Sequence, residues 1–174
     1  SGKTTLLDLI TKLHKPSKGK ILFNDLDINN FSNSDWRNKI SYVTQDPILF
    51  EGNLRDNILL GRDYTDENII NVCKVADLSS FLETKSGLET KIDDNGSNLS
   101  GGQKRRIAIA RSLLNNPFIL IVDEATNSLD EKSEENIFSK LRQIDHLTVI
   151  VVSHRNITKN FVDCNFHIKN GRIE

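Results

Sequence analysis

The sequence has 174 residues, which is enough for one domain with a hydrophobic core. Charged residues make up 27%, and a net charge of -1 argues against a basic surface for nucleic acid or anionic lipid. No apolar run approaches the ~20 residues of a membrane helix, and we expect no signal peptide, so a membrane role would need a partner or another segment. The two cysteines, Cys73 and Cys164, form no metal motif and are expected to be buried, reduced thiols.

The chain begins with Ser1-Gly2-Lys3-Thr4-Thr5, which matches the last part of the phosphate-loop pattern G-x-x-x-x-G-K-[ST]. In that pattern the lysine reaches the β- and γ-phosphates, and the hydroxyl of the last residue reaches Mg²⁺. Four matched residues are a weak signal alone. The spacing of the apolar residues between Thr4 and Leu13 predicts a helix. Apolar side chains would cover much of its circumference, which suits a helix packed under a sheet.

The next segment predicts short elements separated by turns. Lys20 to Phe23 is expected to be a strand, and a short helix is expected around Trp36, whose indole we interpret as a packing anchor. Ile40 to Val43 predicts another strand that ends near Gln45, which could be only a polar strand end. Pro47 then forces the chain out of regular structure.

Residues 53–85 have a helical pattern. Thr65 is expected to cap one helix, and Ser79 with Ser80 to start another. Residues 87–98 are polar and are expected to form a loop.

Ser100-Gly101-Gly102-Gln103 predicts a second helix start. Ser100 can cap the helix, and Gln103 completes a capping box. The two glycines leave backbone N–H groups open to a ligand, and a helix start of this kind favours phosphate. The same residues also fit a capped helix that binds nothing. The helix is expected to continue to Leu114, with a solvated face and one internal ion pair formed by its basic residues, Lys104, Arg105, Arg106 and Arg111.

Phe118 to Val122 is apolar without alternation, which predicts a strand buried on both faces of a parallel sheet. Asp123 and Glu124 follow it, at the carboxyl end where ligands of such sheets bind. A pair of acids at this position is also common as a solvated strand end.

Glu131 to Gln143 predicts a helix and Leu147 to Val152 another buried strand. A strand–helix–strand crossover is right-handed and makes its strands parallel. It therefore places His154 at the sheet edge that carries Asp123 and Glu124. A hairpin is expected at the end of the chain, at residues 170–174.

These motifs, in this order, resemble those of ATP-binding cassette (ABC) ATPases. The segments that carry the resemblance are the signature motif at Leu99 to Gln103, the Walker B strand at Phe118 to Glu124, the D-loop at Ser128-Leu129-Asp130, the switch histidine His154, the Q-loop glutamine Gln45 and the Walker A end at residues 1–5. Residues 46–53 (D-P-I-L-F-E-G-N) are similar to the Q-loop of exporter-type members.

The resemblance implies an α/β fold of the P-loop NTPase class, with a mostly parallel sheet, flanking helices and an inserted helical subdomain. Residues 1–174 would form a single ABC ATPase domain. We expect truncation at both ends, because the sequence has no Met and its phosphate loop starts midway. Residues 1–45 and 116–174 would form the RecA-like core and residues 46–115 the helical subdomain. Residues 90–96 depart from the exporter pattern, which leaves open a membrane-domain contact or a solvated acidic loop.

The resemblance also implies ATP and Mg²⁺ as ligands, and ATP hydrolysis coupled to transport as the activity. Catalysis would depend on Glu124, which would polarise the attacking water, together with His154 and Gln45. The expected metal ligands are Thr4, Gln45 and Asp123. The expected nucleotide-binding residues are Ser1, Gly2, Lys3, Thr4, Thr5, Gln45, Leu99, Ser100, Gly101, Gly102, Gln103 and Asp130.

The chain has two helix N-termini of the kind that binds phosphate, at Lys3 and at Gly101. A single nucleotide needs only one such N-terminus. The family resolves this with a head-to-tail dimer, of like or unlike chains, in which each signature motif closes on the partner's nucleotide. The resemblance further implies transmembrane domains fused upstream and a place at the cytoplasmic face of the plasma (inner) membrane. No nucleic-acid partner is expected.

Two alternatives remain at this stage. One is a soluble ABC-type ATPase that acts on the ribosome or on DNA. Against the DNA-acting relatives, residues 46–98 are too short for their long coiled coil and show no heptad repeat. The other is a cassette that does not hydrolyse ATP, which the presence of Gln45, Glu124 and His154 disfavours.

Overall fold

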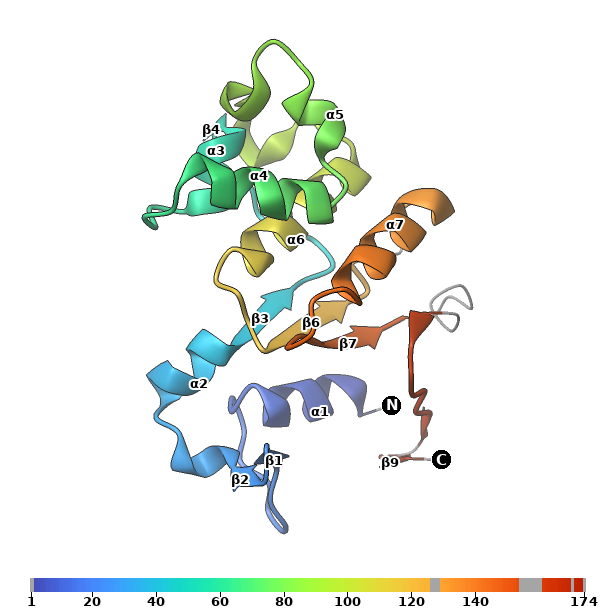
Figure 1. The fold of residues 1–174 in the computed structure, drawn as a ribbon. Helices are drawn as coiled ribbons and strands as arrows, with labels where there is room; N and C mark the ends of the chain where they lie inside the picture. Colours follow the sequence, from blue (N-terminus) through green and yellow to red (C-terminus); the bar gives the residue numbers. More distant parts are fainter. Residues whose placement is uncertain (1, 126–128, 154–160, 170, 174) are drawn as a thin grey trace.

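The structure is a computed structural model that describes residues 2–125, 129–153, 161–169 and 171–173. A three-stranded parallel sheet lies at its centre, in the order β3-β6-β7 (Figure 1). These strands are β3 (Ile40–Val43), β6 (Ile119–Asp123) and β7 (Thr148–Val152). The predicted parallel crossover is therefore confirmed, and Phe118 lies just before the strand rather than in it.

Successive residues of β6 face two different cores, because side chains alternate along a strand. Ile119 and Ile121 pack with Leu7 of α1 (Lys3–Ile10). Leu120 and Val122 pack in the larger core with residues of α6 (Gly101–Leu113). In Figure 1, α1 lies below the sheet, and α6 and α7 (Glu131–Leu141) lie above it. The prediction of a strand buried on both faces is confirmed.

The layer below the sheet includes the hairpin β1 (Leu22–Phe23) and β2 (Leu26–Asp27), a 3₁₀ turn η1 (Ile28–Asn30) and α2 (Asn33–Lys39). Trp36 is 1% exposed, and its indole N–H donates to the Ile10 carbonyl at 2.8 Å. Its role as a packing anchor is confirmed. The first helix ends at Ile10, short of the predicted Leu13, because Lys12 turns to a positive φ of 61° and Leu13 is exposed.

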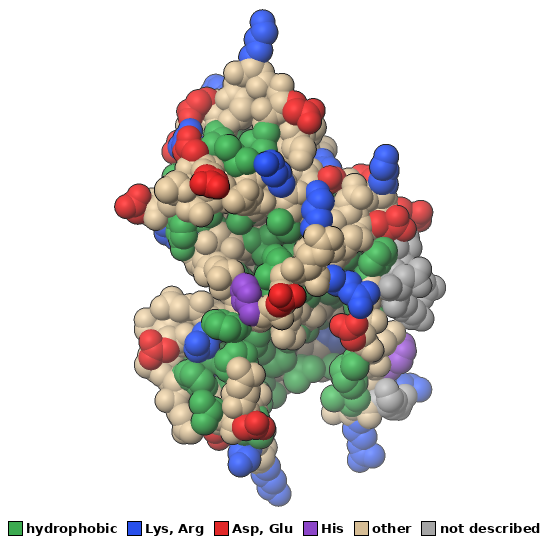
Figure 2. All heavy atoms as spheres, viewed as in Figure 1, with side chains coloured by type: hydrophobic (Ala, Val, Ile, Leu, Met, Phe, Trp, Pro, Cys, Tyr) green, Lys and Arg blue, Asp and Glu red, His purple; other side chains and the backbone are tan. Residues whose placement is uncertain are grey.

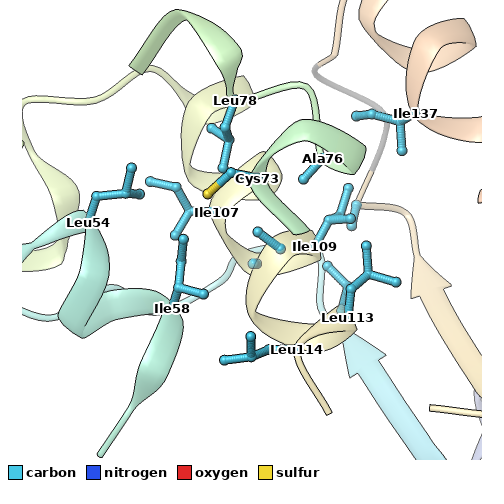
Figure 3. Packing of buried hydrophobic residues seen from close by; sticks show 14 of the residues in the cluster. Leu54, Ile58, Cys73, Ala76, Leu78, Ile107, Ile109, Leu113, Leu114 and Ile137 are labelled. Carbon is cyan, nitrogen blue, oxygen red and sulfur yellow. The ribbon is translucent and has the colours of Figure 1, made fainter. Parts of the chain in front are cut away.

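Short helices pack around α6 in the upper part of the molecule (Figure 1). Beside it the side chains of Ile107, Cys73, Leu78, Leu54 and Ile58 meet (Figure 3). Burial raises the pKa of the Cys73 thiol to about 12, so this thiol stays protonated. The elements of this part are β4 (Gly52–Asn53), α3 (Leu54–Leu59), α4 (Asp66–Val75), α5 (Ser79–Leu82), η2 (Gly87–Glu89), β5 (Lys91–Ile92) and η3 (Asp94–Gly96).

The predicted helix starts in this part are confirmed. Thr65 forms a capping box with Asn68 at the start of α4, and α5 begins at Ser79. The predicted loop at residues 87–98 instead contains β5, which pairs antiparallel with β4. A two-residue pairing is too short to leave a periodic pattern in the sequence.

The last described residues form the predicted hairpin, with β8 (Ile168–Lys169) paired to β9 (Arg172–Ile173). Cys73 is buried as expected, whereas the same expectation for Cys164 is wrong. Cys164 is exposed because residues 163–167 lie outside regular structure and pack into neither core.

Within the described residues, no helix combines the length and the apolar character needed to cross a membrane. Figure 2 shows one face of the molecule, on which Lys and Arg side chains are interspersed with Asp and Glu.

A substitution of Gly96 tests the packing between η3 and α6. Gly96 has a φ of 61°, and an added Cβ would lie 2.9 Å from the Leu49 Cδ1 atom and 3.3 Å from the Lys104 Cε atom. We expect Gly96→Ala to lower the free energy of unfolding by about 2–4 kcal/mol, from backbone strain plus overpacking against buried Leu49. Urea unfolding followed by circular dichroism measures this change.

Gly61→Ala is the matched control, because Gly61 has a φ of 75° but no atom within 4 Å of an added Cβ. It should cost only the strain, about 1–2 kcal/mol. Equal losses for the two variants would show that the contact with Leu49 does not limit this position.

A pH-dependent contribution is expected from Asp130, which caps α7. Its carboxylate accepts the Ser133 backbone N–H at 2.9 Å, and this hydrogen bond holds the pKa of Asp130 below its ordinary value. A depressed folded-state pKa stabilises the fold above the unfolded pKa of about 3.9, and this stabilisation is lost as the pH falls through the folded value. Asp130→Asn keeps a cap without the charge.

The stability of the wild type should therefore fall more steeply than that of Asp130→Asn between about pH 5 and pH 2. Thermal midpoints measured across this range test the difference. Asp130→Ala, which removes the cap itself, should be less stable at every pH. Parallel pH profiles for wild type and Asp130→Asn would contradict the role of the charge.

Candidate functional site

The carboxyl ends of β3, β6 and β7 meet at one edge of the sheet, because the three strands are parallel. Asp123 pairs with Val152 at the end of β6, and the Glu124 backbone N–H donates to the Val152 carbonyl at 2.9 Å. Gln45 follows β3, whose last residue pairs with Val122. The edge therefore gathers Gln45, Asp123 and Glu124. His154 lies outside the described residues.

The Asp123 carboxylate is held by a residue that the sequence did not indicate. The Tyr42 hydroxyl donates to Asp123 Oδ2 at 2.6 Å. The pKa of Tyr42 is raised above its ordinary value by burial, by the hydrogen bond to Asp123, and by the negative charges of Asp123 and Asp8. The hydroxyl thus remains a donor at physiological pH. Asp123 Oδ1 accepts no hydrogen bond from any described residue.

Glu124 has an unusual backbone conformation for a residue with a side chain. Its φ of 51° lies in the left-handed region, which costs about 1–2 kcal/mol for a residue other than glycine. Strain of this kind persists where the surrounding structure holds it, and it is concentrated at functional sites. Here the pairing of the Glu124 N–H with Val152 holds the residue where β6 leaves the sheet.

At the start of α1, the backbone N–H groups of the first turn donate to no described residue. Gly2 precedes the helix with a φ of 101°, makes no side-chain cap, and no acidic residue lies in the first turn. The N–H groups of this turn are therefore open to an anion. Helix α1 begins on the side of the sheet toward which the arrows of β6 and β7 point (Figure 1), with Lys3, Thr4 and Thr5 in its first turn. Ser1 lies outside the described residues.

The second predicted helix start is present as well. Ser100 accepts the Gln103 backbone N–H at 3.2 Å, and the Gln103 side chain accepts the Ser100 N–H at 2.8 Å, so the capping box is confirmed. Gly101 is exposed, Gly102 is half-buried, and Leu99 packs against the larger core. In the described part of the chain, no hydrogen bond or ion pair joins residues 2–5 to residues 99–103.

The basic residues of α6 are not the solvated face that the sequence suggested. The side chains of Arg105 and Arg106 are only 11% and 17% exposed. Arg105 donates to the Gln45 carbonyl at 2.9 Å, while Arg111 donates to the Asn57 carbonyl at 2.8 Å. Their long side chains reach the loops that pack on α6, where backbone carbonyls need donors. The predicted internal ion pair is confirmed as Arg106 with Asp77, at 3.3 Å.

Arg106 also connects α6 to the start of α7. It donates to the Ser133 hydroxyl at 3.1 Å, and Ser133 is the residue whose N–H Asp130 caps. Asp130 is exposed and Leu129 is buried, whereas Ser128 lies outside the described residues. The predicted D-loop aspartate is thus a helix cap that α6 supports through Ser133.

The oxygen donors at the sheet edge suit Mg²⁺, which prefers oxygen ligands from one or two carboxylates together with phosphate oxygens. Asp123 offers Oδ1, and Thr4 and Gln45 carry a hydroxyl and an amide oxygen. No group of three or more His, Cys, Asp or Glu residues within the described ranges forms a metal cluster. Sequence reasoning missed Tyr42 and Arg105, because only the strand register and the packing of α6 bring them to this edge.

The sequence and the fold of this chain are similar to those of known proteins. The family described as "ABC transporter" matches residues 1–127. The beta-(1→2)glucan export ATP-binding/permease protein NdvA of Agrobacterium vitis is 37% identical over 176 residues, which cover 99% of this chain and 30% of the relative. The ATP-dependent permease MDL1 of Candida albicans is 42% identical over 161 residues, which cover 89% of this chain and 24% of the relative.

The solved structure of a bacterial Atm1-family ABC exporter with ATP bound is similar, with a TM-score of 0.88 and 34% identity, over 99% of this chain and 31% of that chain. The chain thus spans about a third or less of the length of these proteins. The fold is that of a P-loop NTPase of the ABC type, as the motifs implied. From the motifs, the fold and these similarities together, the chain belongs to the ABC transporter family.

Proposed function

We propose that this chain is the nucleotide-binding domain of an exporter-type ABC transporter, which binds and hydrolyses ATP with Mg²⁺ to drive export across a membrane. The observation that carries the proposal is the gathering of Gln45, Asp123 and Glu124 at one sheet edge. The RecA-like core would comprise residues 1–45 and 116–174. The helical subdomain would be residues 46–115, which pack around α6.

The residues of this edge have separate roles in hydrolysis. The first-turn N–H groups of α1 bind phosphate, and Lys3 neutralises charge on the transferring phosphoryl oxygens. Glu124 accepts a proton from the attacking water as its oxygen bonds to the γ-phosphorus and the bond to the bridging oxygen breaks. Asp123, Thr4 and Gln45 would hold Mg²⁺, which would supply positive charge beside the phosphates. His154 and Gln45 orient the water.

The second helix start completes the site of a partner. Ser100, Gly101 and Gly102 bind the γ-phosphate held by the other domain, with Leu99, Gln103 and Asp130 supporting this contact. The capped and exposed start of α6 is suited to this role, and no described hydrogen bond links it to α1. The domain would act at the cytoplasmic face of the plasma (inner) membrane, joined to transmembrane domains of the same protein.

The role of Glu124 predicts the behaviour of Glu124→Gln in the full-length protein. The amide keeps the shape of the side chain but cannot accept a proton. ATP binding should persist, while turnover should fall by about 10²-fold or more. Phosphate release and nucleotide binding measured on one preparation test this expectation. Glu135→Gln, at an exposed position of α7, is the matched control and should keep wild-type turnover. Turnover by Glu124→Gln at the wild-type rate would remove Glu124 from catalysis.

The composite site predicts rescue between two inactive chains. Lys3→Ala removes the phosphate-binding cation, and Ser100→Arg places a bulky cation over the exposed start of α6. Each variant should be inactive alone. In a mixed dimer one site carries both changes and the other carries neither, so mixing should restore part of the ATPase activity.

A detached, complete nucleotide-binding domain should also gain activity more steeply than linearly with its concentration, because dimerisation precedes chemistry. Failed rescue alone could reflect two sites that must act together, and a linear dependence alone could reflect a tight dimer. Both results from one preparation would contradict the head-to-tail arrangement.

A further inference from the structure

Tyr42 is the described residue that contacts the proposed metal-binding carboxylate directly and has no part in the mechanism above. Tyr42 lies on β3, where it pairs with Ile121 of β6. Asp123 is two residues beyond Ile121, so its side chain leaves the same face of the sheet. Diagonal neighbours of this kind are within reach of an aromatic side chain. The Tyr42 hydroxyl spans the gap and meets Asp123 Oδ2 at 2.6 Å.

The length of this hydrogen bond fits an O–H donor and an ionised carboxylate, which typically lie about 2.5–2.7 Å apart. Tyr42 has one proton to donate, and Asp123 accepts it through Oδ2. The carboxylate is therefore fixed in one rotation, and Oδ1 is the oxygen left for a metal ion or its bound water. Metal-binding carboxylates are oriented by hydrogen bonds of this type.

Ile121, which pairs with Tyr42, packs with Leu7 of α1, so Tyr42 and Asp123 lie on the face of the sheet that α1 covers. The hydrogen bond between Tyr42 and Asp123 therefore lies on the side of the sheet that faces the helix carrying the proposed metal ligand Thr4.

We infer that Tyr42 is a positioning residue, which orients Asp123 toward Mg²⁺ through the hydrogen bond between its hydroxyl and Asp123 Oδ2. The inference rests on the proposed function, because it needs Asp123 to hold the metal. A competing explanation is that this hydrogen bond only stabilises the edge of the sheet. The two explanations differ in what the loss of one oxygen atom does to metal binding.

Tyr42→Phe removes the hydroxyl and keeps the ring. The test uses the full-length protein carrying Glu124→Gln, so that nucleotide binding is measured without turnover. Mn²⁺ is the probe, because its electron paramagnetic resonance spectrum reports its ligands. For each variant, ATP affinity is measured by calorimetry with Mn²⁺ and again with a chelator. The ratio of the two affinities is the metal's contribution to nucleotide binding.

In Tyr42→Phe this ratio should fall by about 10–100-fold, the usual effect of removing a partner of a metal ligand. The spectrum of bound Mn²⁺ should broaden, because Asp123 is no longer held in one rotation. ATP affinity in the chelator should match that of the Glu124→Gln parent, which also shows that the fold is intact. Tyr64→Phe is the matched control. Tyr42 and Tyr64 are equally exposed, at 37%, and the Tyr64 hydroxyl contacts Asn115.

Asp123→Asn separates failure of this inference from failure of the proposed function. If Asp123→Asn keeps the parent ratio, Asp123 does not hold the metal and both are overturned. If Asp123→Asn lowers the ratio and Tyr42→Phe does not, only the positioning role of Tyr42 is overturned. Adding Tyr42→Phe to Asp123→Asn should lower the ratio no further. If Tyr42→Phe lowers the affinity ratio as much in the Asp123→Asn background as in the parent, Tyr42 does not act through Asp123.

Discussion

Strand β6 pairs in parallel with β7 through residues 119–123 and with β3 through residues 119–122. This register decides where every reactive side chain of the sheet edge lies. A slip of one residue would turn Asp123 to the opposite face of the sheet, away from Tyr42 and α1. It would also break the hydrogen bond from the Glu124 N–H to the Val152 carbonyl. This hydrogen bond holds the backbone of Glu124 in its left-handed conformation. The register is strongly specified because β6 is buried on both faces, so that a slip would have to exchange two well-packed cores.

The two faces of β6 also explain how one domain can present two helix N-termini that are suited to bind phosphate, those of α1 and α6. Ile119 and Ile121 pack against the layer that contains α1, and Leu120 and Val122 pack in the core that contains α6. The two helices are therefore held in different layers, each with its own exposed first turn. A sheet that separates the two starts favours a site shared between two domains over a site in which both starts bind one nucleotide.

Much of this architecture could be predicted from the sequence, because its signals are local. The apolar run before Asp123 indicated a doubly buried strand, and Ser100 with Gln103 indicated a capped helix. The topology then followed from the handedness of the crossover. The partners of the site residues could not be predicted in this way. Tyr42 reaches Asp123 only because of the pairing between β3 and β6, and the burial of Arg105 depends on the loop that packs on α6. Charge patterning alone suggested a solvated face for arginines that satisfy backbone carbonyls instead.

Through these arginines, α6 is hydrogen-bonded to the neighbouring segments of the domain, in addition to presenting its exposed N-terminus. Arg105 donates to the Gln45 carbonyl, and Arg106 reaches both Asp77 and the Ser133 hydroxyl beside the Asp130 cap. Hydrogen bonds from charged groups contribute about 1.5–3 kcal/mol each. Moving α6 independently of the sheet edge would require Arg105 and Arg106 to give up these bonds while both side chains are still largely shielded from water. These hydrogen bonds connect the helix that carries Gly101 and Gly102 to the backbone of Gln45 and to the start of α7. Arg105 thus joins the segment that would sense the nucleotide to the helix that would close on a partner's nucleotide, and Arg106 joins that helix to α7.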